Sequence, residues 1–418
     1  MQKTGWYCST LFLLLVCGLN ASAEQPLTWE KLVQRFQANN PTLLAGRMNI
    51  NEAKADEITA FLRPNPNVSV AGDQIDPFGG GTPHGPFAYF FPVTSFSYLH
   101  ERQHKRELRL ESAKNATAIA MSEEADLERT LLFNLRGAFI QILQAKAVFG
   151  VAKENLNYYD RVLGVSTERF KAGDISQLDL DRLELQRIQY ASDLQTAQVN
   201  LRTAKIQLLM LLNDRTPVEQ FDVTGSFDFV DQIRSLDELR KIALDTRPDL
   251  RTAIETVEKA KADHRLAVAN GSTDPTFGLD VGRNPPIDLY FGASISIPLR
   301  IFDRNQGEKL RTKLDIARTQ RLRDAAEAQV FSDVDSAYAT VDSNLTLLRP
   351  YKEKYLQQAV RVRDAVTFAY QQGGASLLDF LNAESEYRVV QLSYVNLVGS
   401  YLISASQLNL SVGREVIP

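Results

Sequence analysis

Two stretches of the sequence, residues 169–186 (RFKAGDISQLDLDRLELQ) and residues 369–386 (AYQQGGASLLDFLNAESE), repeat one pattern at an offset of 200 residues. A glycine, a serine and two acidic residues recur in the same places: Gly173 and Gly373, Ser176 and Ser376, Asp179 and Asp379, Glu184 and Glu384. A second match lies near an offset of 207 residues, where NPTLLAGRMNINEAKAD from Asn40 pairs with RPDLRTAIETVEKAKAD from Arg247. Because both matches run in the same order, we interpret the chain as a tandem duplication.

The duplication predicts the domain organisation. We expect a first repeat at residues 24–213, a linker at 214–234 and a second repeat at 235–418. Each repeat reads as a helix, two strands, a very long helix, a turn and a returning helix. In the first repeat, the opening helix is expected at about 28–62, the β-hairpin at about 66–97, the long helix at about 99–171 and the tip near 173. In the second, these elements are expected at about 235–269, 275–300 and 306–372, with the tip near 373.

The strands and long helices are predicted from their periodicity. In LYFGASISIPL, residues 289–299, apolar residues alternate with small or polar ones, so one face of the strand is apolar. Seventy residues of helix would reach about 105 Å. Gly150 and Pro350 fall at equivalent places in the two long helices and predict a shared bend. The returning helices carry apolar residues at seven-residue spacing from Leu180 and Phe380, a pattern typical of coiled-coil packing.

The N-terminal sequence is typical of a secretory signal peptide. Lys3 precedes an apolar run, and Ala21-Ser22-Ala23 offers a cleavage site, so we expect residues 1–23 to be removed. Cys17 offers lipid attachment as the alternative. The two cysteines both lie in this segment, so the mature chain must rely on packing and oligomerisation rather than on disulfides. Beyond it we find no apolar run near the ~18 residues of a membrane helix, so any insertion would have to use strands.

The number of strands predicts a trimer. Two hairpins supply four strands per chain, whereas a closed membrane barrel needs about eight or more. Three chains would supply twelve. The predicted fold is therefore mainly α with a small transmembrane β part: a tandem-repeat protomer of long coiled-coil helical hairpins plus four β-strands. This protomer would trimerise into a 12-stranded β-barrel that an α-helical barrel continues.

Two further stretches carry a family resemblance. SIPLRIFDRNQGEKLRTKLDIAR, residues 296–318, resembles the strand-to-helix junction of the TolC-like outer-membrane efflux proteins, and most of all their heavy-metal branch. YQQGGASLLDFLNAESEY, residues 370–387, resembles their hairpin tip. The first repeat departs at its junction, where residues 98–102 lack the glycine that residues 303–307 contain, so the turn geometry there is in question.

The resemblance implies a passive outer-membrane channel that extends into the periplasm. It would be the exit duct of a tripartite efflux system, as a homotrimer in outer-membrane lipid, and would conduct substrate from an inner-membrane pump of RND or similar type through a periplasmic adaptor protein. Heavy-metal cations are the suggested cargo. No catalytic site, cofactor or bound metal is expected, and the slightly negative net charge of −4 gives no reason to expect nucleic acid as a partner.

The resemblance also implies two kinds of functional residue. Asp364 would form an acidic ring at the periplasmic gate of a trimer, with Arg361 or Arg363 pairing across protomers to close it. The first repeat has Gly164 at that place. The adaptor would dock on the hairpin tips, at Gly173, Asp174, Ile175, Ser176, Gly373, Gly374, Ser376 and Leu377. The alternatives are that Asp364 is an ordinary solvated charge and that the tip leucines belong to the coiled-coil seam.

HERQH, residues 100–104, matches the His-Glu-x-x-His motif of zinc hydrolases. Arg102, Lys105 and Arg106 would repel a divalent cation in a buried site, so we favour a solvated, cationic helix start over catalytic zinc. Two alternatives to the channel remain at this level, the zinc hydrolase and a periplasmic coiled-coil scaffold or adaptor that never inserts. Aromatic residues near the strands could form an interfacial girdle: Phe87, Tyr89, Phe90, Phe91, Tyr98, Tyr290, Phe291 and Phe302.

Overall fold

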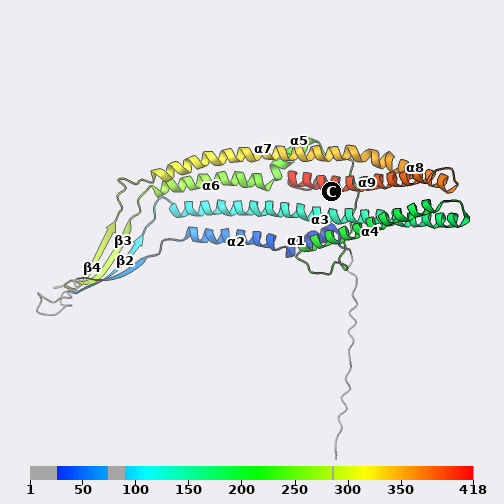
Figure 1. The fold of residues 1–418 in the computed structure, drawn as a ribbon. Coiled ribbons are helices and arrows are strands. Elements are labelled where there is room, and N and C mark those ends of the chain that lie inside the picture. Colours follow the sequence, from blue (N-terminus) through cyan, green and yellow to red (C-terminus); the bar gives the residue numbers. More distant parts are fainter. Residues whose placement is uncertain (1–25, 74–89, 285–286, 418) are drawn as a thin grey trace, which may run out of the picture.

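The structure is a computed structural model that describes residues 26–73, 90–284 and 287–417. The chain is a long rod, with the sheet at one end and the tips of two helical hairpins at the other (Figure 1). The strands are inclined to the axis of the long helices (Figure 1). The expected signal peptide lies outside the described residues, as do Phe87 and Tyr89.

The described part of the first repeat contains four helices and two strands. They are α1 (Trp29–Asn39), α2 (Pro41–Phe61), β1 (Asn67–Asp73), β2 (Phe91–Leu99), α3 (Lys105–Ala172) and α4 (Gln177–Leu211). The 68 residues of α3 span about 102 Å at the rise of an α-helix. This helix is therefore longer than a compact domain is wide.

The second repeat follows the same order. Its elements are α5 (Leu236–Thr246), α6 (Pro248–Asn270), β3 (Thr276–Asn284), β4 (Ile287–Ser296), α7 (Gln306–Pro350), the π-helical segment η1 (Tyr351–Tyr355), α8 (Leu356–Gln371) and α9 (Leu377–Val412). The mainly helical fold with four strands is the predicted one.

The opening helix of each repeat is divided, where one continuous helix was predicted. Asn40 and Arg247 have extended backbones, with ψ of 117° and 121°, and each precedes the proline that begins the next helix. A proline ring clashes with a helical conformation at the residue before it, which explains the break in both repeats. In the first repeat the Asn40 side chain also accepts a hydrogen bond from the Leu43 amide at 3.0 Å, capping α2.

The shared bend expected at Gly150 and Pro350 is wrong in the first repeat. Helix α3 continues through Gly150, whereas α7 ends at Pro350 and is followed by the π-helical turn η1. Proline removes an amide donor and crowds the preceding carbonyl, so it forces a rearrangement. A glycine keeps its donor and only lowers helix propensity.

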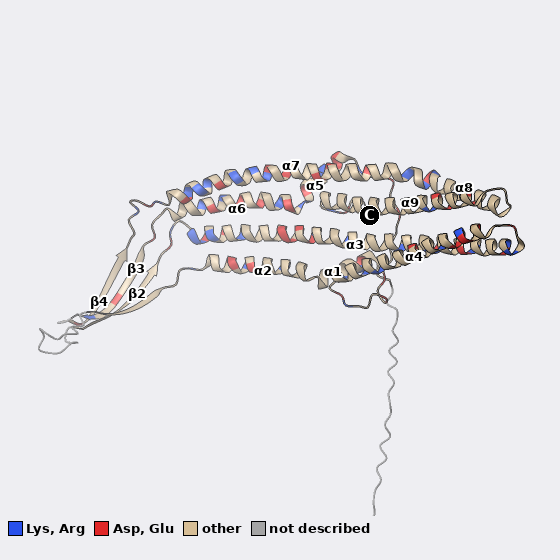
Figure 2. Cartoon of the chain, in the orientation of Figure 1, with Lys and Arg blue, Asp and Glu red and all other residues tan. Residues whose placement is uncertain are grey.

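The four strands form one antiparallel sheet in the order β1-β2-β3-β4. The register aligns apolar residues across one face, including the rows Val68, Phe96, Leu279 and Tyr98, Phe277, Ile295. The opposite face carries small or polar residues, such as the row Ser69, Ser95, Asp280, Gly292. Figure 2 shows charged side chains abundant on the helices and sparse on the strands.

The helices pack as open layers that continue the sheet. Beside the sheet the order is α2, α3, α6, α7, and toward the tips it is α4, α3, α9, α8. Buried apolar clusters hold these layers together near the chain termini, around Leu135 and Leu208 on one side and Val341 and Tyr401 on the other. A third cluster lies under the tips.

Among the described helices, α3 has one stretch apolar enough to cross a membrane by length and composition, which the sequence analysis had not found. A single such stretch is weak support for a membrane span. Here α3 packs against α2, α4, α6 and α9, so we assign it to the interior of the helical layers.

Candidate functional site: the helical tips

The two hairpin tips have the same backbone geometry. Gly173 and Gly373 adopt left-handed conformations, with φ of 87° and 77°, which an L side chain disfavours. The amides of Asp174 and Gly374 donate to the carbonyls of Arg169 and Ala369, at 2.9 and 2.8 Å. These bonds close the last turn of α3 and α8 in the same way.

The helices that leave the tips are capped alike. The Ser176 hydroxyl accepts from the Asp179 amide at 3.1 Å, and the Ser376 hydroxyl accepts from the Asp379 amide at 3.2 Å. Asp379 completes a capping box by accepting from the Ser376 amide. The Ser-x-x-Asp spacing in both copies of the repeat therefore marks a helix start.

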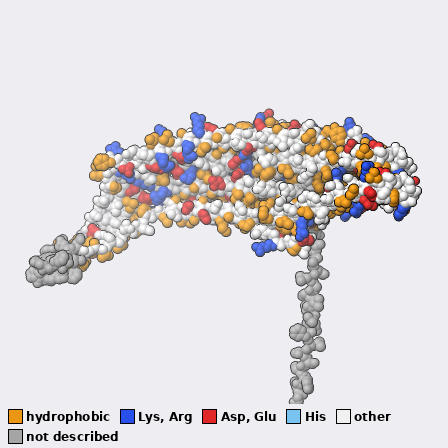
Figure 3. Space-filling model, in the orientation of Figure 1, with side chains coloured by type: hydrophobic (Ala, Val, Ile, Leu, Met, Phe, Trp, Pro, Cys, Tyr) orange, Lys and Arg blue, Asp and Glu red, His pale blue; other side chains and the backbone are white. Residues whose placement is uncertain are grey.

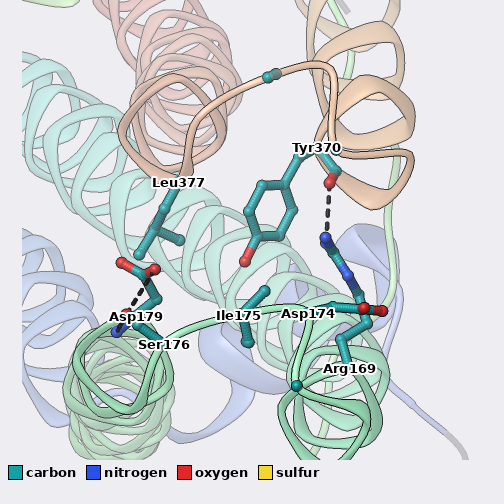
Figure 4. A pocket seen from close by; sticks show the side chains of 10 residues that line it. Arg169, Asp174, Ile175, Ser176, Asp179, Tyr370 and Leu377 are labelled. Carbon is teal, nitrogen blue, oxygen red and sulfur yellow. Dashed lines mark hydrogen bonds between the residues drawn. The ribbon is translucent and has the colours of Figure 1, made fainter.

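The tips touch each other within one chain. The Arg169 guanidinium donates to the Tyr370 carbonyl at 2.9 Å and lies over the Tyr370 ring (Figure 4). Between the tips lies an open groove of about 530 Å³. Most of the residues that the sequence analysis assigned to adaptor docking line it: Gly173, Asp174, Ile175, Ser176, Gly373 and Leu377. Gly374 and Ser376 are exposed at the tip but do not line the groove.

The leucines after each tip divide into two roles. Leu377 is half-buried and packs against the cluster under the tips. Leu178 and Leu378 occupy the same place in the two repeats and are 59% and 66% exposed. In a single chain, the tips thus present two equivalent uncovered leucines.

An aromatic layer lies beneath the tips. The rings of Tyr159 and Tyr190 stack at 4.7 Å between centroids, and those of Tyr370 and Phe380 stack at 5.1 Å. Tyr159 and Phe380 are fully buried. Burial raises the pKa of Tyr190 to about 12 and also raises that of Tyr159, so both of these phenols stay neutral near pH 7. This layer joins α3, α4, α8 and α9 into one unit.

Asp364 lies on α8, about 13 Å from Gly373 by helix rise. Its side chain is 55% exposed, and it accepts from Arg363 Nη2 at 2.7 Å. Arg363 is 13% exposed and lies over the rings of Tyr158 and Tyr387, at 4.7 and 4.0 Å. In one chain, Arg363 is therefore held beside Asp364 by its own helices. Arg361 is exposed and, among residues 26–73, 90–284 and 287–417, forms no ion pair.

Glu384 is a residue that the sequence analysis did not select. It lies on α9 next to the seam residues Phe380 and Tyr387, and it is only 5% exposed. The repeat pairs it with Glu184, which is exposed. Residue type therefore gave no sign of its burial, which depends on the packing of α9 between α3 and α8.

The HERQH motif is not helical. His100 belongs to a loop after β2, where its amide donates to the Pro275 carbonyl at 2.9 Å. Glu101 binds the Arg109 guanidinium, with 2.9 Å between Nη2 and Oε2. His104 caps α3 with a φ of 53°. The two imidazoles therefore do not share a helix face, and the described residues contain no group of three or more potential metal ligands. HERQH therefore lacks the helical arrangement of a zinc hydrolase site.

The expected solvated helix start is also wrong in part, because Lys105 is buried. Its ammonium donates to Asp274 at 2.6 Å and to the Ser272 carbonyl at 3.0 Å, which ties α3 to the segment before β3. The ion pair also holds the pKa of Asp274 below its usual value, against the opposing effect of burial. This contact joins the two repeats where the helices meet the sheet.

The missing glycine of the first junction has no structural consequence. Asn305 caps α7 with a φ of 60°, as His104 caps α3 with a φ of 53°. Gly307 lies inside α7 and makes no part of this turn. The two junctions therefore share a left-handed cap, with His104 matching Asn305, although residues 100–104 form a shorter junction than residues 297–305.

An elongated protomer, with a two-faced sheet at one end and paired helical tips at the other, defines the class of channels that join a strand barrel to a helical barrel. Residues 239–414 match the family described as Outer membrane efflux protein. The cobalt-zinc-cadmium resistance protein CzcC of Cupriavidus metallidurans is 22% identical over 402 residues, which cover 94% of this chain and 91% of that protein. Outer membrane protein TolC of Escherichia coli is 20% identical over 305 residues, covering 68% of this chain and 62% of TolC.

A crystal structure of CusC superposes with a TM-score of 0.77 at 18% identity and covers 92% of each chain. The second half of the chain matches the outer membrane efflux protein family, and the described chain has the fold of the CusC channel. It is thus an outer membrane efflux channel that extends into the periplasm, and it is not an enzyme, as predicted. The periplasmic scaffold that never inserts, the alternative interpretation, is thereby set aside. TolC-like channels form trimers.

Proposed function

We propose that three copies of this chain form the exit duct of a tripartite efflux system. The duct passively conducts substrate from an inner-membrane pump of RND or similar type, through a periplasmic adaptor, to the exterior. The observation that carries this proposal is the open sheet: β1 and β4 are its two edges, and each leaves a row of backbone donors and acceptors unpaired within the described chain. In lipid such edges are costly, and joining β4 of one copy to β1 of the next would remove them.

The helical layers support the same closure. The flanking helices are α2 and α7 beside the sheet and α4 and α8 toward the tips. On α4, exposed apolar residues recur at multiples of seven residues: Leu185, Val199 and Ile206. On the other flank, Tyr355, Val362 and Phe368 are exposed. A neighbouring copy would cover both stripes by coiled-coil packing.

The test is the state of the purified protein. We expect it to leave membranes only in detergent and to run at three times the mass of one chain, measured by light scattering with a correction for bound detergent. Dilution should not release a folded monomer, because each copy would expose two sheet edges. A monomer that stays folded and soluble without detergent contradicts the proposal.

We also propose that the protomer arose by duplication, with a first repeat at 24–213, a linker at 214–234 and a second repeat at 235–418. The matching breaks at Asn40 and Arg247, the matching junction caps and the matching tips support it. Limited proteolysis tests the boundary: first cleavage inside a repeat rather than in 214–234 argues against it.

The gate belongs to the same proposal. Asp364 would form a ring of three carboxylates where the helices converge, with Arg363 holding each one in place and Arg361 free to pair with the next copy. The support is that Asp364 remains 55% exposed although Arg363 binds it.

We assign adaptor docking to the two tips, because Leu178 and Leu378 are uncovered in equivalent positions. Changing both leucines to glutamate should weaken binding of the cognate adaptor on the order of 100-fold or more, since each buried leucine contributes about 1.5–3 kcal/mol. Surface plasmon resonance with the immobilised trimer measures the affinity.

The matched control is Asn200→Glu, which adds the same charge to an exposed place on α4, about 33 Å from Leu178 by helix rise. It should leave adaptor affinity unchanged. Equal affinities for the double leucine variant and the wild type would remove the tips as the docking surface.

Heavy-metal cations are the cargo that we propose. The support is the similarity to CzcC over nearly the whole chain. The decisive measurement is the tolerance of a deletion strain to cobalt, zinc and cadmium; tolerance equal to that of the parent strain contradicts this cargo.

A further inference from the structure

Glu384 is a buried carboxyl group, and the proposed gate and docking roles do not explain its burial. One of its oxygens, Oε1, is buried and has no hydrogen-bond partner among the described residues. A carboxylate without partners is costly to bury, so such a group either binds a proton or changes its surroundings. Its counterpart Glu184 is exposed and needs no such account.

The groups around Glu384 come from four helices. Helix α3 contributes tyrosines, α4 contributes Tyr190, and α8 contributes the Arg363–Asp364 pair. Glu384 interacts electrostatically with Tyr158, Tyr159, Tyr190, Arg363 and Asp364. Other titratable or charged groups of this cluster are Glu154, Arg161, Asp193, Tyr370, Tyr387 and Arg388. Near pH 7 the tyrosines are neutral, so Arg363 is the cation that acts directly on Glu384.

Arg363 interacts with two carboxyl groups, as an ion pair with Asp364 and through its charge with Glu384. It is bound to Asp364 on its own helix, and its guanidinium lies 4.0 Å from the centre of the Tyr387 ring, one helical turn from Glu384 on α9. An ionised Glu384 would therefore compete with Asp364 for Arg363. A protonated Glu384 leaves Arg363 with Asp364, the arrangement that the structure has.

We propose that Glu384 is a proton-binding site that sets which carboxylate Arg363 pairs with, and through this how firmly α8 and α9 pack at the tip. The switch rests on the fold of one chain. Its effect on conduction rests additionally on the gate role proposed for Asp364. When the proton leaves, Arg363 turns toward Glu384, Asp364 is released and the buried cluster loosens.

The direction of the pH dependence follows from burial. Desolvation raises the pKa of Glu384 from 4.5 to about 7, while Arg363 lowers it and Asp364 raises it by smaller amounts. The packed tip binds the proton more tightly than a loosened tip does. The bound proton therefore contributes its full stabilisation of the packed tip below pH 4.5. This contribution declines as the pH rises toward 7 and is absent above 7. Over that range the opening equilibrium should rise on the order of 100-fold.

Two measurements on full-length protein in detergent test the proposal. The first is the infrared band of a protonated carboxyl group, which should titrate near pH 7 in the wild type and be absent in Glu384→Gln. The second is hydrogen exchange of residues 356–390 from pH 5 to 8.5, corrected for the intrinsic rate. In the wild type, protection should fall as the pH rises. In Glu384→Gln, whose amide keeps the shape but never ionises, protection should stay at its acid level.

Glu184→Gln is the matched control, because it makes the same change at the equivalent exposed place. It should reproduce both wild-type titrations. The proposal is overturned if the band titrates near 4.5, if exchange at the tip is the same at all pH values, or if Glu384→Gln keeps the wild-type profile. Neither readout needs a membrane, an adaptor or ion conduction. A channel that conducts but shows no titration would refute this site alone, and a titrating protein that does not conduct would refute the proposed duct alone.

Discussion

Phe291→Arg is expected to abolish assembly of the channel in the outer membrane. Phe291 lies on β4, is 76% exposed and belongs to the apolar face of the sheet, in register with Val281 on β3. That face would contact lipid in a closed barrel. An arginine near the bilayer midplane costs about 2–4 kcal/mol per copy, and the trimer would contain three. The measurement is the amount of trimer in isolated outer membranes.

The neighbouring residue supplies the control. Tyr290 is next in the chain but lies on the opposite face, in register with Gly282. Tyr290→Arg would place its charge toward the water-filled interior and should leave most of the trimer in place. In Figure 3 a few apolar side chains are visible on the described part of the strands, whose surface in this view is mostly white. Loss of assembly in Tyr290→Arg but not in Phe291→Arg would mean that the two faces are assigned the wrong way round.

The second large effect is expected at Asp364. In planar bilayers, Asp364→Lys should lower the preference for cations over anions on the order of tenfold, because three negative charges would become three positive ones at the proposed gate. Asp364→Ala should lie between the wild type and the lysine variant. Conductance and reversal potential in a salt gradient measure both.

Asp237→Lys is the control for a charge away from the duct. Asp237 lies on α5, and its side chain is 84% exposed. Its change should leave selectivity at the wild-type value. If Asp364→Ala has wild-type conductance and selectivity as well, Asp364 has no role as a gate.

The fold could be predicted because its signals are local and repeated. Alternation in residues 289–299 marks a strand wherever it occurs, and two copies of one tip pattern place two helical hairpins. The breaks at Asn40 and Arg247 were also available from the sequence, since each residue precedes a proline. They were missed because the apolar pattern continues across them.

The site was less predictable, because burial depends on the neighbour that a helix face meets. Glu184 and Glu384 occupy the same place in the repeat, yet one is exposed and the other is buried beside Arg363. Likewise, His104 takes a left-handed conformation. The comparison of the two junctions considered only the missing glycine and did not predict this conformation. Neither property follows from residue type alone.

The π-helical turn after Pro350 has a consequence for mechanics. It occurs in the rod formed by α7 and α8, while the corresponding rod of the first repeat, α3, has no such interruption. Around a ring of three protomers, the uninterrupted helix α3 and the interrupted rod of α7 and α8 would alternate. The circumference would then have three stiff and three compliant positions, so a dilation that keeps the symmetry would concentrate its motion in the compliant three.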